Sequence, residues 1–90
     1  MLQSVFKYAF EVEDHFDLSM PKDADILSVQ VQGEQPCIWA LVEPGAAIEH
    51  RHFRLVGTGH PISENIDTLE FIGTFQLRGG ILVFHLFEVV

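Results

Sequence analysis

The sequence predicts a single all-β domain, residues 1–90, that folds as a small antiparallel sandwich or barrel of about seven short strands with at most one short helix. Three observations support this fold class. Apolar and polar residues alternate with a period of two through most of the chain, which is typical of strands with one buried face. Turn-forming residues separate the alternating segments at short intervals. Ninety residues are the length of one domain, and 48% of them are hydrophobic, which is more than one small core of this length can bury and favours an oligomer.

The first three predicted strands all show this alternation. Val5–Val12 places its aromatic residues on one face and its charged residues on the other. Phe16–Met20 is a second, shorter strand, which ends at a proline. In the third strand, Leu27, Val29 and Val31 are expected to share the buried face.

A different pattern marks the middle of the chain. A hairpin loop at Gly33–Pro36 leads into Cys37–Glu43, which is apolar at nearly every position and therefore predicts a strand covered on both faces. We expect Trp39 to be a core residue and Cys37 to be a buried, unreactive thiol. Because Cys37 is the one cysteine, no intrachain disulfide can form.

The next elements are a strand and an irregular connection. Ile48–Val56 predicts a fifth strand that begins after a Pro-Gly turn. Gly57–Pro61 predicts a loop, because glycine and proline punctuate it. Ile62–Thr68 is expected to be irregular or to form a single helical turn capped by Ser63.

The last hairpin is the clearest predicted element. Glu70–Leu77 and Ile81–Val89 flank Gly79-Gly80, which suits a two-residue turn whose central residues need positive φ. This register pairs Leu77 with Leu82, Phe75 with Phe84, and Thr74 with His85. The expected core face consists of Phe71, Phe75, Leu77, Leu82, Phe84 and Leu86. Because Phe and Ile also occur on the other face, we expect a homodimer or a larger homo-oligomer.

Charge excludes some classes of partner. Thirteen acidic residues against five Lys and Arg give a net charge of −8, which repels a phosphate backbone, so duplex nucleic acid is not an expected partner. The chain has no apolar stretch long enough for a membrane helix and opens without a signal peptide, so no membrane partner is expected. The single cysteine fits a reducing environment, so a cytoplasmic location is expected. All three arginines and four of the five histidines follow Glu43. A small anion is therefore expected to bind the second half of the chain.

The candidate ligand-binding residues lie around the glycine-containing loop. Glycines allow backbone N–H groups to converge on an anion, and Arg can hold a phosphate through paired hydrogen bonds. The predicted site residues are Arg54, Gly57, Thr58, Gly59, His60, Gln76, Arg78 and His85. The alternative interpretation is a tight turn with surface ion pairs, since the loop lacks the lysine and the following helix of a phosphate-binding loop.

A metal site has weaker support. His50 and His52 lie on one face of the fifth predicted strand, as the metal ligands of cupin barrels do. No carboxylate follows at the expected distance, and a third ligand would have to come from His60 or His85 through folding. We therefore expect no metal and no cofactor, with this histidine pair on a solvated or interface strand face.

Several short strings carry a family resemblance that spans roughly residues 6–88. They are Met20-Pro21, residues 26–32 (ILSVQVQ), residues 39–42 (WALV), residues 57–62 (GTGHPI), residues 72–76 (IGTFQ) and residues 83–87 (VFHLF). In combination they resemble a family of short proteins encoded by tailed phages and prophages, catalogued as a domain of unknown function. The resemblance implies a phage accessory protein in the cytoplasm of a bacterial host, and it supplies no catalytic residue.

Three functions remain open from the sequence. The first is sequestration, without catalysis, of a small nucleotide-like or phosphorylated ligand, such as a signal of bacterial antiphage defence. The second is a protein–protein interaction module, either a phage structural accessory or a direct inhibitor of a host enzyme. The third is a small hydrolase that uses His60 with His50 or His52.

Overall fold

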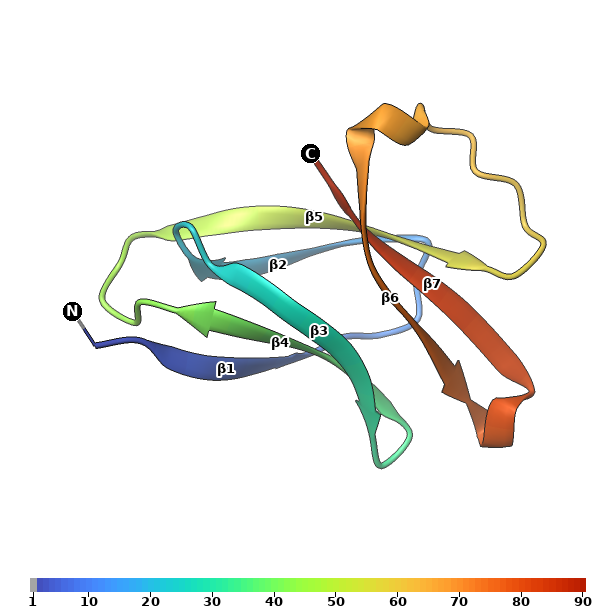
Figure 1. Ribbon diagram of the computed structural model, residues 1–90, viewed down its shortest axis with the longest axis horizontal. Coiled ribbons are helices and arrows are strands. Elements are labelled where there is room, and N and C mark those ends of the chain that lie inside the picture. The colour runs from blue at the N-terminus through green and yellow to red at the C-terminus, as the bar shows by residue number, and fades with distance from the viewer. Residues whose placement is uncertain (1) are drawn as a thin grey trace.

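The computed structural model describes residues 2–90 and consists of two antiparallel β-sheets packed face to face (Figure 1). Strands make up more than half of the chain, which confirms the predicted all-β class, and of the two predicted architectures the structure is the sandwich. The strands are β1 (Ser4–Ala9), β2 (His15–Pro21), β3 (Asp25–Gln32), β4 (Gln35–Val42), β5 (Ile48–Gly57), β6 (Leu69–Leu77) and β7 (Leu82–Val89). Two single-turn 3-10 helices complete it, η1 (Ile66–Thr68) and η2 (Arg78–Gly80). Within the described part of the chain, no helix is long and apolar enough to span a bilayer.

The strand order leaves the two sheets unequal. One sheet has three strands in the order β1-β4-β3, and the other has four in the order β2-β5-β7-β6. The edge strands β3 and β6 come close together and join the sheets on that side (Figure 1). A Cβ atom at Gly73 would lie 2.8 Å from Cγ1 of Val29, so this approach requires a residue without a side chain.

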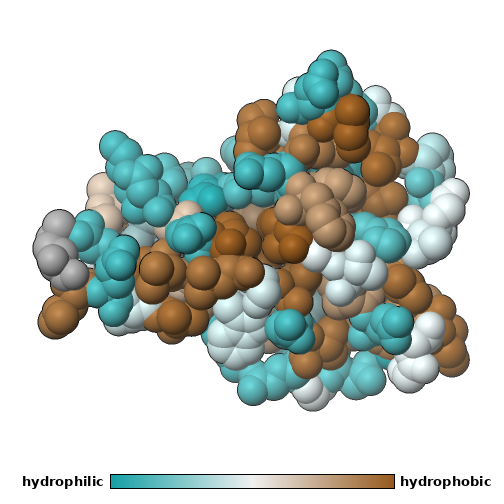
Figure 2. Space-filling view, viewed as in Figure 1, coloured by the Kyte–Doolittle hydropathy of each residue, from teal (hydrophilic) through white to brown (hydrophobic). Residues whose placement is uncertain are grey.

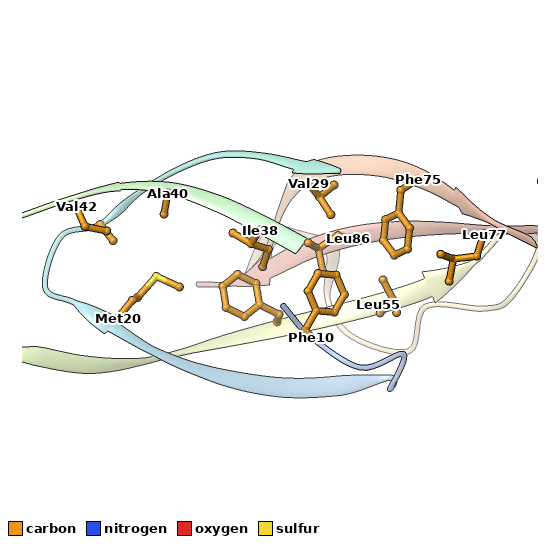
Figure 3. Packing of buried hydrophobic residues seen from close by; sticks show 12 residues of the cluster. Phe10, Met20, Val29, Ile38, Ala40, Val42, Leu55, Phe75, Leu77 and Leu86 are labelled. Carbon is orange, nitrogen blue, oxygen red and sulfur yellow. The ribbon is translucent and has the colours of Figure 1, made fainter. Parts of the chain in front are cut away.

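The core lies between the inner faces of the sheets (Figure 3). Ile38, Ala40 and Val42 enter it from β4, and Met20, Phe53 and Leu86 enter it from the four-stranded sheet. Three rings stack in series, with centroids 4.6 Å apart for Phe10 and Phe16 and 5.3 Å apart for Phe16 and Phe53. Burial of a side chain of this size contributes about 1.5–3 kcal/mol, so these residues account for much of the stability of the small domain.

The last hairpin has the predicted register. Leu77 pairs with Leu82, Phe75 with Phe84 and Thr74 with His85. Its turn has positive φ at Gly79 and Gly80, and the Ile81 N–H donates a hydrogen bond to the Arg78 carbonyl at 3.2 Å. The buried state of Cys37 is also as predicted.

Two β-bulges make the buried faces of β3 and β6 differ from the predicted ones. In β6 the register shifts between Phe71 and Gly73, so Phe71 leaves the expected core face and is 59% exposed, while Ile72 packs against the core instead. In β3 the register shifts between Ile26 and Ser28, so Leu27 is exposed and Ile26 takes its place. In both strands one extra residue reverses the alternation on one side of the bulge.

Three local predictions also need correction. The β3–β4 turn consists of Gly33 and Glu34, both with positive φ, because Gln35 and Pro36 already belong to β4. The short helix η1 is capped by Asn65, whose side chain accepts the Asp67 N–H, and not by Ser63. Trp39 lies on the outer face of the three-stranded sheet, half-buried, because the second sheet packs against only the opposite face of β4.

Candidate functional site

The glycine-containing loop lies beside His85 on the outer face of the four-stranded sheet. The Nε2 atom of His85 is 2.7 Å from Oγ1 of Thr58, and its Nδ1 atom is 2.8 Å from Oγ1 of Thr74. Both ring nitrogens of His85 therefore have a threonine hydroxyl as hydrogen-bond partner. A hydroxyl can accept a hydrogen bond from a ring N–H or donate one to a ring nitrogen without hydrogen. The arrangement joins the loop to β6 and β7.

Most backbone amides of this loop are engaged within the protein. The Thr58 N–H donates to the Val83 carbonyl at 3.2 Å, and the His60 N–H donates to the Gly57 carbonyl at 3.1 Å. The ring of His60 lies over Gly57, where an added Cβ would come within 3.1 Å of it. The predicted convergence of free N–H groups on an anion is therefore reduced, because the amide of Thr58 is already bonded.

A cavity of about 320 Å³ adjoins the loop. Its lining is mostly apolar and consists of Gly57, Thr58, His60, Ile81, Leu82, Val83 and Phe84. No arginine lines it. The cavity could accept a small apolar group beside two polar side chains, but it offers no guanidinium to a phosphate.

Arg54 does not have the geometry expected of an anion clamp. It is 8% exposed, and its Nε donates to Oε2 of Glu64 at 2.8 Å. Its Nη1 donates to the carbonyl of Leu55 at 2.7 Å and lies 3.4 Å from that of Asp14. The hydrogen bond from Arg54 lowers the pKa of Glu64. Arg54 therefore holds the loop that carries Glu64 against β5.

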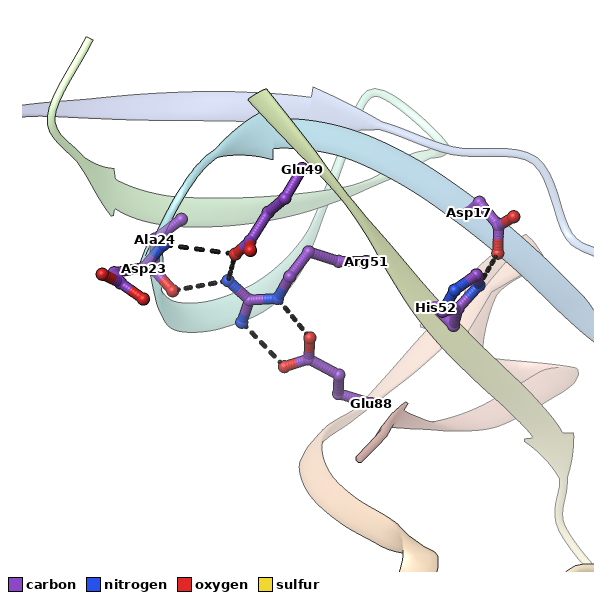
Figure 4. Close-up of polar contacts among 7 residues, drawn as sticks. All are labelled: Asp17, Asp23, Ala24, Glu49, Arg51, His52 and Glu88. Atoms are coloured by element: carbon purple, nitrogen blue, oxygen red, sulfur yellow. Dashed lines mark hydrogen bonds and ion pairs between the residues drawn. The ribbon is translucent and has the colours of Figure 1, made fainter. Parts of the chain in front are cut away.

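Arg51 makes a second internal ion pair, on the inner side of the same sheet (Figure 4). Its Nε and Nη2 donate to the two carboxylate oxygens of Glu88, the latter at 2.9 Å, and its Nη1 donates to the Ala24 carbonyl at 2.8 Å. These contacts raise the pKa of Arg51, with the Glu88 hydrogen bond as the largest cause. The pairing could not be found from the sequence, because Arg51 and Glu88 lie on strands far apart along the chain.

Arg78 lies apart from the loop, at the open end of the sandwich. Its backbone N–H donates to Glu34 at 3.0 Å, while its guanidinium makes no hydrogen bond or ion pair with any described residue. A cavity of about 630 Å³ adjoins it, lined by Val12, Glu34, Leu77, Arg78 and Leu82. Gln76 reaches toward the turn, where a Cβ at Gly80 would lie 3.1 Å from its Oε1. The predicted site residues therefore do not form one site, because Arg54 and Arg78 lie apart from the cavity beside the loop.

Histidines and their partners form a polar ladder across β2 and β5. The Nδ1 atom of His52 is 2.5 Å from a carboxylate oxygen of Asp17 (Figure 4), and the Nδ1 atom of His50 is 3.0 Å from Oγ of Ser19. Both imidazoles thus bond to the neighbouring strand, on an exposed sheet face. Among residues 2–90, no three His, Cys, Asp or Glu side chains are grouped so as to hold a metal ion.

An apolar area remains exposed at the start of β6 and the end of β7. Leu69 pairs with Val89 and Phe71 with Phe87, on the outer face of the sheet. We call these four residues the Phe71 patch. The Phe71 and Phe87 rings pack edge to face with centroids 5.4 Å apart. Figure 2 shows hydrophobic side chains at this corner of the molecule, beside hydrophilic ones.

Comparison with known families assigns the chain to one family. A family model described as "Domain of unknown function (DUF7352)" matches residues 1–90, and the chain therefore belongs to this family. Neither the curated proteins nor the solved structures contain a match. Membership of a family of unknown function agrees with the resemblance in the sequence, and the phage origin stays a prediction.

Proposed function

We propose that this member of the DUF7352 family is a protein-binding module that contacts its partner through the Phe71 patch. The supporting observation is the Phe71 side chain, 59% exposed at the centre of paired apolar residues. Contiguous exposed apolar area that includes aromatic rings is typical of protein-interaction sites. Asp67 and Glu70 are exposed next to the patch in the sequence. The expected partner surface is therefore apolar at its centre and basic at its rim.

The resemblance to short phage and prophage proteins extends this proposal. It favours an accessory role during infection, in the cytoplasm of the bacterial host, with a phage structural protein or a host enzyme as the bound partner.

Affinity capture with matched variants tests the surface. Wild type, Phe71→Ser and Ile81→Ser would each be immobilised and exposed to bacterial lysate. Ile81 is 82% exposed outside the patch, so it controls for the loss of any exposed apolar side chain. We expect a protein retained by wild type and Ile81→Ser and reduced about tenfold or more by Phe71→Ser, as for an aromatic interface residue. Equal retention by all three variants, or none by wild type, would overturn the proposal.

Sequestration of a small phosphorylated or nucleotide-like ligand is the second candidate. One observation favours it: Thr58 and His60 line the 320 Å³ cavity, and the His60 ring has no hydrogen-bond partner among residues 2–90. It ranks second because Arg54 and Arg51 are engaged by Glu64 and Glu88. An anion in a protein of net charge −8 needs a compensating cation.

Thermal unfolding in the presence of nucleotides, cyclic dinucleotides and sugar phosphates tests the second candidate. A ligand that raises the melting temperature of wild type but not of His60→Ala, with no product formed, would support sequestration. Product formation would favour the third possibility, a hydrolase. No shift at about 1 mM of any compound would leave the protein-binding proposal in place.

A further inference from the structure

The outer edge of β1 is a free strand edge. β1 ends the three-stranded sheet, and it pairs on one side with β4. All its residues except Tyr8 are exposed, with Val5 at 56% and Phe6 at 38%. Figure 2 shows hydrophobic side chains along the rim that β1 forms in Figure 1. Unpaired N–H and C=O groups beside exposed apolar side chains can accept another strand.

The other edges of the sandwich are covered or protected. β3 and β6 lie against each other, with Gly73 close to Val29. β2 contains Pro21, which has no N–H to donate, and the exposed carboxylate of Asp17. Both features discourage pairing with a further strand. β1 has neither, so it is the edge best suited to extend a sheet.

Lys7 is the charged residue of β1, and its ammonium group does not lie at the free edge of the strand. Its ammonium group donates a hydrogen bond to Oε1 of Gln32 at 2.8 Å and lies 5.9 Å from the centroid of the Trp39 ring. Trp39 is on β4 and Gln32 is on β3, so the lysine side chain crosses its own sheet, away from the free edge. A lysine at a strand edge usually prevents association by keeping its charge there.

We propose that two copies of this chain pair through β1, antiparallel and around a two-fold axis at Phe6, to form a continuous six-stranded sheet. In this register Phe6 faces Phe6 of the second copy, and Val5 lies opposite Lys7. In this pairing, each inner-face residue of one copy lies opposite an inner-face residue of the other copy, as a continuous sheet requires. A register centred on Lys7 would oppose two ammonium groups, which is destabilising.

Charge favours a second copy at this edge. Each chain carries a net charge of −8, so two copies repel each other wherever carboxylates would face across the contact. Residues 2–10 contain no Asp or Glu, and β1 therefore offers an approach without opposed carboxylates. One short strand edge covers less than the about 800 Å² per partner of a standard interface. We therefore expect a dissociation constant of about 1–100 µM.

Sedimentation of purified protein tests the dimer. Wild type should be dimeric at about 200 µM, and Phe6→Lys should raise the dissociation constant about tenfold or more. Ile48→Lys is the matched control, since Ile48 is 63% exposed on β5 and should leave the dimer intact. A monomeric wild type at this concentration overturns the proposal. So does a dimer that Phe71→Ser disrupts and Phe6→Lys does not, because the interface would then be the Phe71 patch.

Oxidative crosslinking tests the register independently of stability. Phe6→Cys places two thiols across the two-fold axis, within reach of a disulfide, whereas Cys37 is 1% exposed and should not react. We expect Phe6→Cys to form a covalent dimer under mild oxidation faster than Ile48→Cys does. Equal rates for the two variants would overturn the β1 pairing.

Discussion

At the scale of single residues, two of the three arginines stabilise the fold. The sequence offers Arg51, Arg54 and Arg78 as the only guanidinium groups. Arg51 and Arg54 each bind a carboxylate and at least one backbone carbonyl, in places with little access to water. Removing one partner from such a pair leaves a charge without compensation, which costs more than the pair itself contributes.

Replacing Arg51 should therefore destabilise the protein. Arg51→Ala leaves the Glu88 carboxylate, 13% exposed, without its bidentate partner, and we expect a loss of about 3 kcal/mol in urea denaturation. Arg78→Ala is the control, and because its guanidinium has no partner among residues 2–90 the change should stay within about 0.5 kcal/mol. Equal losses in the two variants would contradict a stabilising role for the Arg51 pair.

The pair of Arg54 and Glu64 should make stability depend on pH. The pKa of Glu64 is lowered in the folded protein, so its ionised form contributes stability above the usual value of 4.5, and this contribution is lost as the pH falls through the lowered value. The melting temperature of wild type should exceed that of Glu64→Gln at about pH 6, and the difference should shrink toward about pH 3. Glu11→Gln, at an exposed position, is the control. A difference that does not change with pH would contradict this account.

At the scale of elements, bulges decide which side chains reach the surface. The shift in β6 moves Phe71 outward and Ile72 inward, and the shift in β3 exposes Leu27. Between these two strands the sheets approach so closely that Gly73 has no room for a side chain beside Val29. The bulges and this close contact together join the edges of the two sheets.

A methyl group at Gly73 should disturb this junction. Its Cβ would lie 2.8 Å from Cγ1 of Val29, so Gly73→Ala should cost about 1–3 kcal/mol. Combining it with Val29→Ala should cost less than the sum of the two single changes, because the clashing atom is gone. Gly45→Ala, which meets nothing within 4 Å, is the control in the same denaturation series. Strict additivity would show that the clash does not govern the effect.

At the scale of the whole molecule, a net charge of −8 opposes association, while apolar residues remain exposed at β1 and at the Phe71 patch. These two surfaces belong to different sheets. A dimer through β1 would therefore leave the Phe71 patch of each copy available, and a two-fold assembly would present it twice.

Salt should promote the proposed dimer. The screening length falls from about 10 Å at 0.1 M to about 3 Å at 1 M salt, which weakens repulsion between acidic copies more than it affects strand pairing. The dimer fraction measured by sedimentation should therefore rise with sodium chloride. A fall with salt would indicate an interface held by ion pairs, contrary to the acid-free edge at β1.

The sequence by itself determined the number and approximate limits of the strands, the all-β class and the register of the last hairpin. These features follow from alternation along the chain and from the φ that Gly79 and Gly80 allow, and both are local properties. Of the candidate site, Thr58 and His85 were both among the predicted residues, and the structure places their side chains in contact.

Only the tertiary structure decided which groups are free to act. The pairing of Arg54 with Glu64 and of Arg51 with Glu88 depends on where separate strands and loops meet, and no local pattern encodes it. The same holds for the outward position of Phe71, because a bulge forms where sheet packing requires it and then reverses the alternation that predicted a buried ring.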